Sequence, residues 1–376
     1  MVDADWLREV VSPQVDGMLY CPSVIGALFN NGTWRELILP RCVTERTMPT
    51  SNRSTGLFLF GFIAIAFVCG SVPAQEKIKF PVGVGTKTIG TNMFWLATKK
   101  GFFDEFGLDV QPVLLRGTAI TMQALVSESL YLALGSADAT IGAAASGVDL
   151  LAVGGVVNGL TQAIVAAKNY KTIKELRGAT IGVQVLTSGA TNVLKRILKQ
   201  NGLEYPADYK LLAVGGGSFN LAALISGQLG ATYLVVPLDH SAEQQGFNVL
   251  GYFKDSFPNY QLSVLAVKRA RAEKNRGPLI RFLKGAVRAH RWLYANKEAA
   301  IDFLAKEIPL KPELARRGWE YYTTNRIWHP NAEINLEGLK FTMQIYAEEF
   351  KGPPPDPLKY IDRSYLQQAI RELGAH

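Results

Sequence analysis

The sequence is poor in cysteine and histidine, which removes two kinds of chemistry. Its 376 residues include three cysteines and four histidines. The histidines form no i, i+4 pair and no metal-ligand spacing with carboxylates, so we expect neither a metal site nor a cofactor. All cysteines precede residue 75, which excludes a cysteine nucleophile from the rest of the chain. They are Cys21, Cys42 and Cys69, and the histidines are His240, His290, His329 and His376.

The chain also lacks an apolar run long enough for a good transmembrane helix. Its longest uncharged apolar stretch, residues 56–69, has 14 residues, whereas a span needs roughly 20. Arg53 precedes this stretch, and Val72-Pro73-Ala74 follows with the small residues that a signal peptidase reads. The pattern predicts a signal peptide over residues 48–74, cleaved after Ala74, and therefore export to the periplasm. An uncleaved anchor is the alternative, and Val68 before Cys69 argues against lipid attachment.

Residues 1–47 have no clear role, because a signal peptide is read at the N-terminus. We expect this stretch to be a non-native or disordered extension created by a misplaced start codon, with Met48 as the initiator; a genuine extension is the alternative. The 302 residues after Ala74 carry 35 Lys and Arg against 26 Asp and Glu, a net charge of +9. Such a balance suits an anionic partner, and export argues against nucleic acid.

From residue 77 onward, short apolar runs alternate with amphipathic stretches, as in mainly parallel sheets covered by helices. The expected strands are 78–84, 108–114, 131–134, 150–157, 180–184, 209–214, 231–235, 249–253 and 261–267. The expected helices are 92–100, 118–127, 137–146, 189–201, 218–228, 239–245, 278–296, 297–307, 312–324, 335–350 and 362–373. The pattern therefore predicts two similar α/β units followed by helices.

Two extended crossings, near residues 162–168 and 258–267, are typical of a two-segment hinge. They predict one lobe from residues 76–162 plus 264–376 and a second from residues 168–258. Two sequential domains are the alternative.

The segment Gly83–Thr88, GVGTKT, resembles a phosphate loop only superficially. That loop needs glycine directly before Lys-Ser or Lys-Thr, and Thr86 stands there. A dinucleotide-binding pattern also fails, because the third spaced glycine and the later acidic residue are missing.

Small hydroxyl residues and glycines recur where strands lead into helices. Helix starts present unpaired N–H groups and partial positive charge, so several of them at one cleft favour an anion. Ordinary N-capping is the better explanation of any single junction, whereas the set of junctions facing each other across two lobes favours a binding site. The predicted ligand-binding residues are Thr86, Thr88, Asn92, Arg116, Gly117, Ser136, Thr187, Ser188, Gly189, Gly216, Ser218 and Pro237.

Three other features have ordinary interpretations as well as functional ones. Arg116 can pair a carboxylate or sulfonate, or form a surface ion pair. Trp95 and Trp328 can stack on a ligand ring or pack in the core. His290 lies in a basic helix that favours a solvated face or a docking surface.

Several segments carry a family resemblance: residues 94–103 (FWLATKKGFF) with 106–110 (FGLDV), 173–183 (IKELRGATIGV), 222–228 (AALISGQ) and Pro237. In this order and spacing they resemble the periplasmic substrate-binding proteins of ABC importers of the nitrate, sulfonate, taurine and bicarbonate type, which share a superfamily with thiamine-precursor synthases. The likeness covers about residues 78–305. It implies the type II periplasmic binding fold, α/β, with two Rossmann-like lobes and a two-segment hinge, here followed by a helical C-terminal extension.

The resemblance also implies a function. A monomeric protein would capture a small solute between its lobes without catalysis and deliver it to a membrane permease with its ATPase. Residues 127–130 (SESL) depart from the family's usual Gly-Glu-[Ile/Val]-Asp, and Gly230 stands where the later repeat usually has aspartate. Sulfonate, nitrate, bicarbonate, aromatic carboxylate and pyrimidine ligands all stay open, with a small organic anion preferred. An enzyme on the same fold, or a sensing module for a membrane receptor, are the alternatives.

Overall fold

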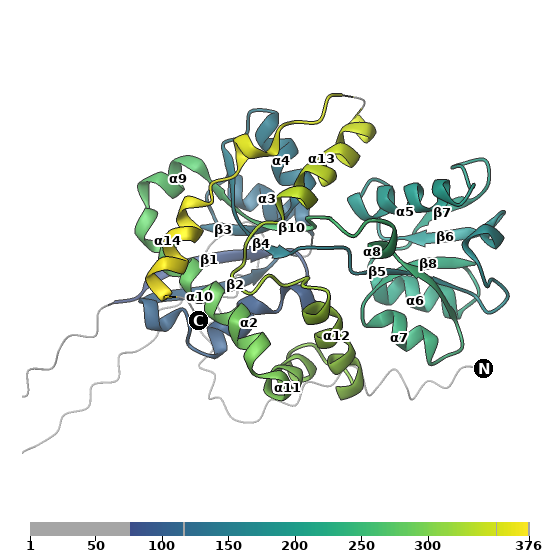
Figure 1. Ribbon diagram of the computed structural model, residues 1–376, viewed down its shortest axis with the longest axis horizontal. Helices are drawn as coiled ribbons and strands as arrows, with labels where there is room; N and C mark the ends of the chain where they lie inside the picture. The colour runs from purple at the N-terminus through teal and green to yellow at the C-terminus, as the bar shows by residue number, and fades with distance from the viewer. Residues whose placement is uncertain (1–75, 116, 351, 375–376) are drawn as a thin grey trace, which may run out of the picture. The chain divides into compact units, whose positions relative to one another are not determined.

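The two expected α/β units appear as two five-stranded sheets in a computed structural model (Figure 1). The structure describes residues 76–115, 117–350 and 352–374, all of which fall in one compact unit. The predictions for residues 1–47, for the signal peptide at 48–74 and for Arg116 lie outside the described residues.

The first sheet has the order β2-β1-β3-β10-β4. Strand β1 pairs in parallel with β2 and β3, whereas β10 runs antiparallel to β3 and β4. The predicted return of the chain to the first sheet is thus confirmed, as an antiparallel strand. The bounds are β1 Ile78–Val84, β2 Leu108–Leu114, β3 Leu132–Ser136, β4 Leu150–Val157 and β10 Ser263–Lys268.

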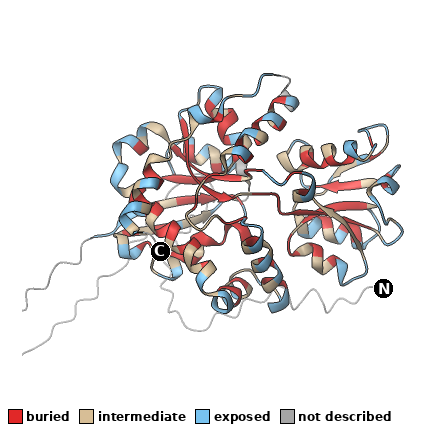
Figure 2. Cartoon of the chain, viewed as in Figure 1, coloured by how far each residue is buried: buried red, intermediate tan, exposed pale blue. Residues whose placement is uncertain are grey.

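Helices cover the first sheet because its strands are apolar on both faces (Figure 2). Helices α2 (Met93–Lys99) and α10 (Arg276–Ala295) pack together on the side of β2. Helices α3 (Thr118–Val126) and α4 (Ala137–Ala145) contact β3. In the core, the ring of Phe282 on α10 stacks at 5.0 Å on Phe80 and at 5.0 Å on Phe103.

The second sheet repeats this arrangement with the order β7-β6-β8-β5-β9. Strand β6 is parallel to β7 and β8, and β5 is antiparallel to β8 and β9. The strands are β5 Gln162–Ala166, β6 Thr180–Val183, β7 Lys210–Ala213, β8 Ala231–Val235 and β9 Asn248–Tyr252. The helices are α5 Gly189–Gln200, α6 Gly217–Ile225, α7 Leu238–Glu243 and α8 Phe253–Ser256.

The chain changes sheet twice. The sequence predicts residues 162–166 within the first crossing, but they form β5, a strand of the second sheet with partners on both sides. The connections between the sheets are therefore residues 158–161 and 257–262. Gln261 of the second connection is hydrogen-bonded to the first, because its side-chain nitrogen donates to Asn158 Oδ1 at 2.9 Å. The same nitrogen also donates to Ser263 O, at the start of β10, at 2.8 Å. The lobe boundaries themselves remain a proposal.

The rest of the chain is helical, as predicted. It consists of α9 Arg269–Lys274, α10, α11 Lys297–Glu307, α12 Pro312–Thr324, α13 Leu336–Phe350 and α14 Ser364–Leu373. Short 3-10 helices are η1 Ile89–Thr91, η2 Asp104–Phe106, η3 Ile173–Leu176 and η4 Pro357–Tyr360. Within the described part of the chain, no helix combines the length and apolarity needed to cross a bilayer. The two-lobed α/β architecture with a helical C-terminal part is thus confirmed.

Candidate functional site

The predicted ligand residues follow the carboxyl ends of parallel strands. Strands β1, β2 and β3 run in one direction, and so do β6, β7 and β8. The segments after these strands therefore gather at one edge of each sheet, the usual ligand position in open α/β sheets. We call these two edges the carboxyl edges.

Buried polar atoms without a protein partner concentrate at the carboxyl edges. The described residues contain eight such side-chain atoms, and six of them belong to residues at these edges. Buried polar groups are normally hydrogen-bonded, so such exceptions need a cause. The six are Asn92 Nδ2 and Oδ1, Thr140 Oγ1, Asn220 Oδ1, Asp239 Oδ1 and Ser263 Oγ.

In the segment after β1, the Thr91 hydroxyl forms hydrogen bonds within the turn, whereas the side chain of Asn92 has no partner. Thr91 Oγ1 accepts from Thr88 N at 2.9 Å and donates to Thr86 O at 2.8 Å, which closes the turn. Asn92 is 1% exposed, and both polar atoms of its amide lack a partner. Among the residues predicted after β1, Asn92 is thus the one with buried polar atoms that lack a partner.

The starts of α3 and α6 are open. Gly117 is the N-cap of α3, and Gly216 is the N-cap of α6. Apart from the adjacent residues of the chain, no atom lies within 4 Å of the position that a Cβ would take at either glycine. Gly117 has a φ of +131°, a backbone conformation that favours glycine. Ser218, in the first turn of α6, is exposed. The space beside both N-cap glycines is therefore open, and the first N–H groups of a helix have no partner within that helix.

At the start of α5, the hydroxyl of Ser188 is already used. Ser188 Oγ accepts from Thr191 N at 3.2 Å, so it caps the helix in the ordinary way. Thr187 beside it is exposed. A ligand role for these two residues and for Gly189 stays a prediction.

The starts of α4 and α5 meet, although the two helices belong to different sheets. Asp138 Oδ2 lies 2.6 Å, and the Tyr260 hydroxyl 3.3 Å, from the point where a Cβ on Gly189 would stand. Burial and the charge of Asp138 raise the pKa of Tyr260, so this hydroxyl is protonated. Ser136, the N-cap of α4, lies opposite Ser263 in the sheet.

The segment after β8 contacts α12. Pro237 is buried, follows a cis peptide bond, and its Cδ lies 3.7 Å from the Cβ position of Gly318. Tyr252 Oη donates to Asp239 Oδ2 at 3.0 Å and accepts from Arg317 Nη2 at 3.0 Å. Burial raises the pKa of Asp239, opposed by the hydrogen bond from Tyr252. Burial and the carboxylate raise the pKa of Tyr252 to about 12.

Sequence reasoning missed Asp138, Tyr260 and Asp239. Asp138 and Asp239 each lie in the first helical turn after a parallel strand, a signal that was present in the junction pattern. Tyr260 lies in the second crossing, where no periodicity marks it. The stacking role considered for Trp328 is wrong, because this side chain is 0% exposed and donates to Gly90 O at 3.2 Å. Trp95 is partly buried against the core beneath Lys87.

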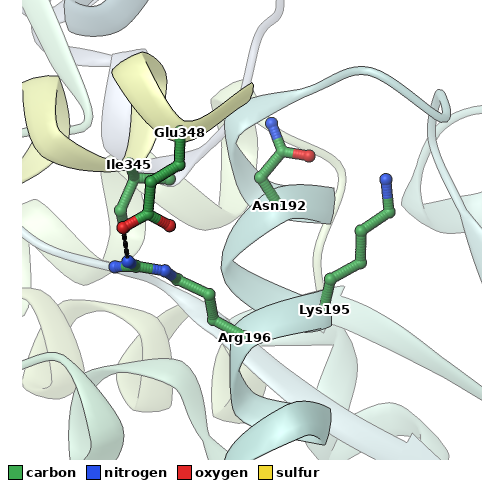
Figure 3. Close-up of a pocket in the computed structure, with 5 residues that line it drawn as sticks. All are labelled: Asn192, Lys195, Arg196, Ile345 and Glu348. Atoms are coloured by element: carbon green, nitrogen blue, oxygen red, sulfur yellow. Dashed lines mark hydrogen bonds and ion pairs between the residues drawn. The ribbon is translucent and has the colours of Figure 1, made fainter. Parts of the chain in front are cut away.

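Two surface hollows are lined by residues other than the predicted ligand residues. Figure 3 shows the first, of about 240 Å³, which is lined by Asn192, Lys195 and Arg196 of α5 and by Ile345 and Glu348 of α13. Arg196 and Glu348 form an ion pair there. The second, of about 560 Å³, lies beside the crossings and includes Asn158, Asn259 and His329. Neither hollow is lined by a predicted ligand residue. Separately, the described residues contain no cluster of His, Cys, Asp and Glu suited to a metal ion.

Comparisons with known proteins agree with this architecture. A binding protein of Brucella abortus is 25% identical over 252 residues, covering 66% of this chain and 77% of the relative. The periplasmic aliphatic sulphonate binding protein SsuA from Escherichia coli shares the fold, with a TM-score of 0.61, 22% identity, and coverage of 76% of this chain and 92% of that one.

An enzyme shares the fold too. The desulfurization enzyme DszB superposes with a TM-score of 0.60 and 14% identity, over 79% of this chain and 100% of that one. The model of the family described as NMT1/THI5 like matches residues 91–300, more than half of the sequence. The chain therefore belongs to the NMT1/THI5-like family.

Proposed function

We propose that this protein is the solute-binding component of an ABC import system. It captures a small organic anion, such as a sulfonate or carboxylate, between its lobes in the periplasm and delivers it to a membrane permease. The observation that carries the proposal is the concentration of unpartnered buried polar atoms at both carboxyl edges. The binding proteins among its relatives support the same role.

The open helix starts supply a mechanism for binding. The amides that follow Gly117 and Gly216 can donate to an anionic oxygen, and the helix dipole favours negative charge there. A ligand that contacts both edges stabilises the arrangement in which the lobes approach, because those contacts need both lobes. This step requires no bond to be broken.

A catalytic role on this fold has less support. A nucleophilic mechanism based on cysteine has no candidate after residue 69, and the junctions carry mainly glycine, serine and threonine. We expect a bound ligand to be recovered unchanged, as mass spectrometry after prolonged incubation would show. Conversion of the ligand would overturn the assignment.

A charge at Gly216 tests the site. Gly216→Asp keeps a good N-cap for α6 and adds a fixed negative charge in open space, whereas Gly216→Asn adds the same shape without charge. Full-length protein is first screened by thermal shift against sulfonates and carboxylates, and hits are measured by calorimetry. We expect Gly216→Asp to weaken anion binding by about tenfold or more, and Gly216→Asn to bind like the natural protein. Equal affinities of the two variants would contradict a ligand at this edge.

A further inference from the structure

Asp138 brings a carboxylate from one lobe to a helix start of the other. It is the second residue of α4, and its Oδ2 packs against Gly189, the first residue of the 12-residue helix α5. The contact depends on glycine, because a Cβ at position 189 would stand 2.6 Å from that oxygen. Asp138 Oδ1 accepts from Ala139 N at 2.8 Å, so one oxygen is held by its own helix.

This contact changes what the start of α5 can bind. A helix start attracts negative charge, and the carboxylate of Asp138 supplies it from within the protein. An anionic group of a solute placed here would approach a like charge in a site partly shielded from water, which is unfavourable. At the starts of α3 and α6, apart from the adjacent residues of the chain, no described carboxylate lies within 4 Å of the position that a Cβ would take at Gly117 or Gly216.

Two buried hydroxyl groups lie on residues close to Asp138 in the fold. Thr140, two residues further along α4, is 0% exposed, and Ser263, opposite the N-cap Ser136 in the sheet, is 9% exposed. Neither Thr140 Oγ1 nor Ser263 Oγ has a protein partner. Hydroxyl oxygens and a carboxylate can all accept hydrogen bonds from N–H groups.

We infer that Asp138 determines ligand selectivity by requiring an N–H donor, such as an ammonium group, on the solute that bridges α4 and α5. The inference rests on the proposed function and refines it. The ligand carries both an anionic group, held at the open start of α3 or α6, and a donor group held by Asp138. A simple anion without an N–H group is then a poor ligand.

Matched ligand pairs test this selectivity. The pairs are 3-aminopropane-1-sulfonate with propane-1-sulfonate, and 4-(aminomethyl)benzoate with 4-methylbenzoate, each measured by calorimetry on the full-length protein. We expect the amino compound to bind about 10- to 100-fold more tightly than its partner, as for a charge-assisted hydrogen bond. Asp138→Asn should remove the preference. Asp302→Asn removes the same charge from an exposed position on α11 and should leave the preference intact.

A second probe does not depend on the organic ligand. In Asp138→Asn the start of α5 loses its internal carboxylate, so inorganic sulfate should raise the melting temperature of this variant more than that of the natural protein. If the natural protein binds both members of a pair equally, or if Asp138→Asn keeps the preference, the inference fails while the proposed function stands. If the natural protein binds no small organic anion, with or without an amino group, both fail.

Discussion

At the scale of single residues, the burial of His290 makes the free energy of unfolding depend on pH. Its side chain is fully buried in α10, with Nδ1 2.7 Å from His329 O and Nε2 without a partner. Burial lowers the pKa of His290 to about 4, against about 6.5 in an unfolded chain. Between these values the unfolded state takes up a proton and the folded state does not. The stability present above pH 6.5 is therefore lost as the pH falls toward 4.

Replacing His290 should flatten this pH dependence. Between pH 7.5 and pH 5, the free energy of unfolding of the natural protein should fall by about 2 kcal/mol more than that of His290→Gln. Urea unfolding at a series of pH values measures the difference. His240→Gln, which changes a partly exposed histidine on α7, is the control and should keep the natural slope. A His290→Gln variant with the natural slope would contradict the assignment.

The position of His290 could have been predicted from spacing. It follows the buried residues Leu283, Ala286 and Val287 of α10 by seven, four and three positions, which places it on the same helix face. The sequence interpretation rested on the basic residues Arg281, Lys284, Arg288 and Arg291, which are exposed or partly exposed, whereas His290 itself lies on the buried face of the helix. The junction pattern already placed Asp138 at a helix start, but its contact with Gly189 follows only from the tertiary fold.

At the scale of elements, α10 offers two glycines in contrasting surroundings. A Cβ at Gly285 would lie 2.4 Å from Cδ1 of the buried Phe103, whereas a Cβ at Gly277 meets nothing within 4 Å. We expect Gly285→Ala to lower the free energy of unfolding by about 1–3 kcal/mol through overpacking. Gly277→Ala should cost less than Gly285→Ala and bring no gain from helix propensity, because position 277 lies in the first turn of α10 and directly precedes Pro278, which disfavours a Cβ there in the helical conformation. Urea denaturation measures both, and a stabilised Gly285→Ala variant would show that α10 can move away from Phe103.

Elements with a full hydrophobic period could be predicted from the sequence, and short ones could not. The bounds of β1, β2, β4, β8, α11 and α12 agree with the expected ranges. Helices α8 and α9 and the 3-10 helices η1, η2 and η4 have three to six residues, too few to establish a period. The pairing of β5 with β8 and β9 depends on segments about 70 to 90 residues away, which a five-residue apolar run does not reveal.

At the scale of the whole molecule, side chains of the C-terminal helices contact the second sheet and its helices. Arg317 on α12 donates to Tyr252 at the end of β9, and Tyr252 donates to the buried Asp239. Tyr321 Oη, also on α12, donates to Leu160 O in the first crossing at 3.0 Å. The rings of Tyr252 and Tyr321 lie 5.8 Å apart. Tyr252 therefore connects α12 to the second lobe through hydrogen bonds and ring packing.

Tyr252→Phe removes both hydrogen bonds of this hydroxyl and keeps the ring. Asp239 then stays buried with neither carboxylate oxygen bonded to another side chain, so the free energy of unfolding should fall by about 1–3 kcal/mol. Because Arg317 loses its partner across the lobes, small-angle X-ray scattering should also give a larger radius of gyration for the ligand-free variant. Tyr205→Phe, at an exposed tyrosine, is the control and should change neither quantity. If Tyr252→Phe lowered stability without changing the radius of gyration, Tyr252 would stabilise its own lobe and would not hold the two lobes together.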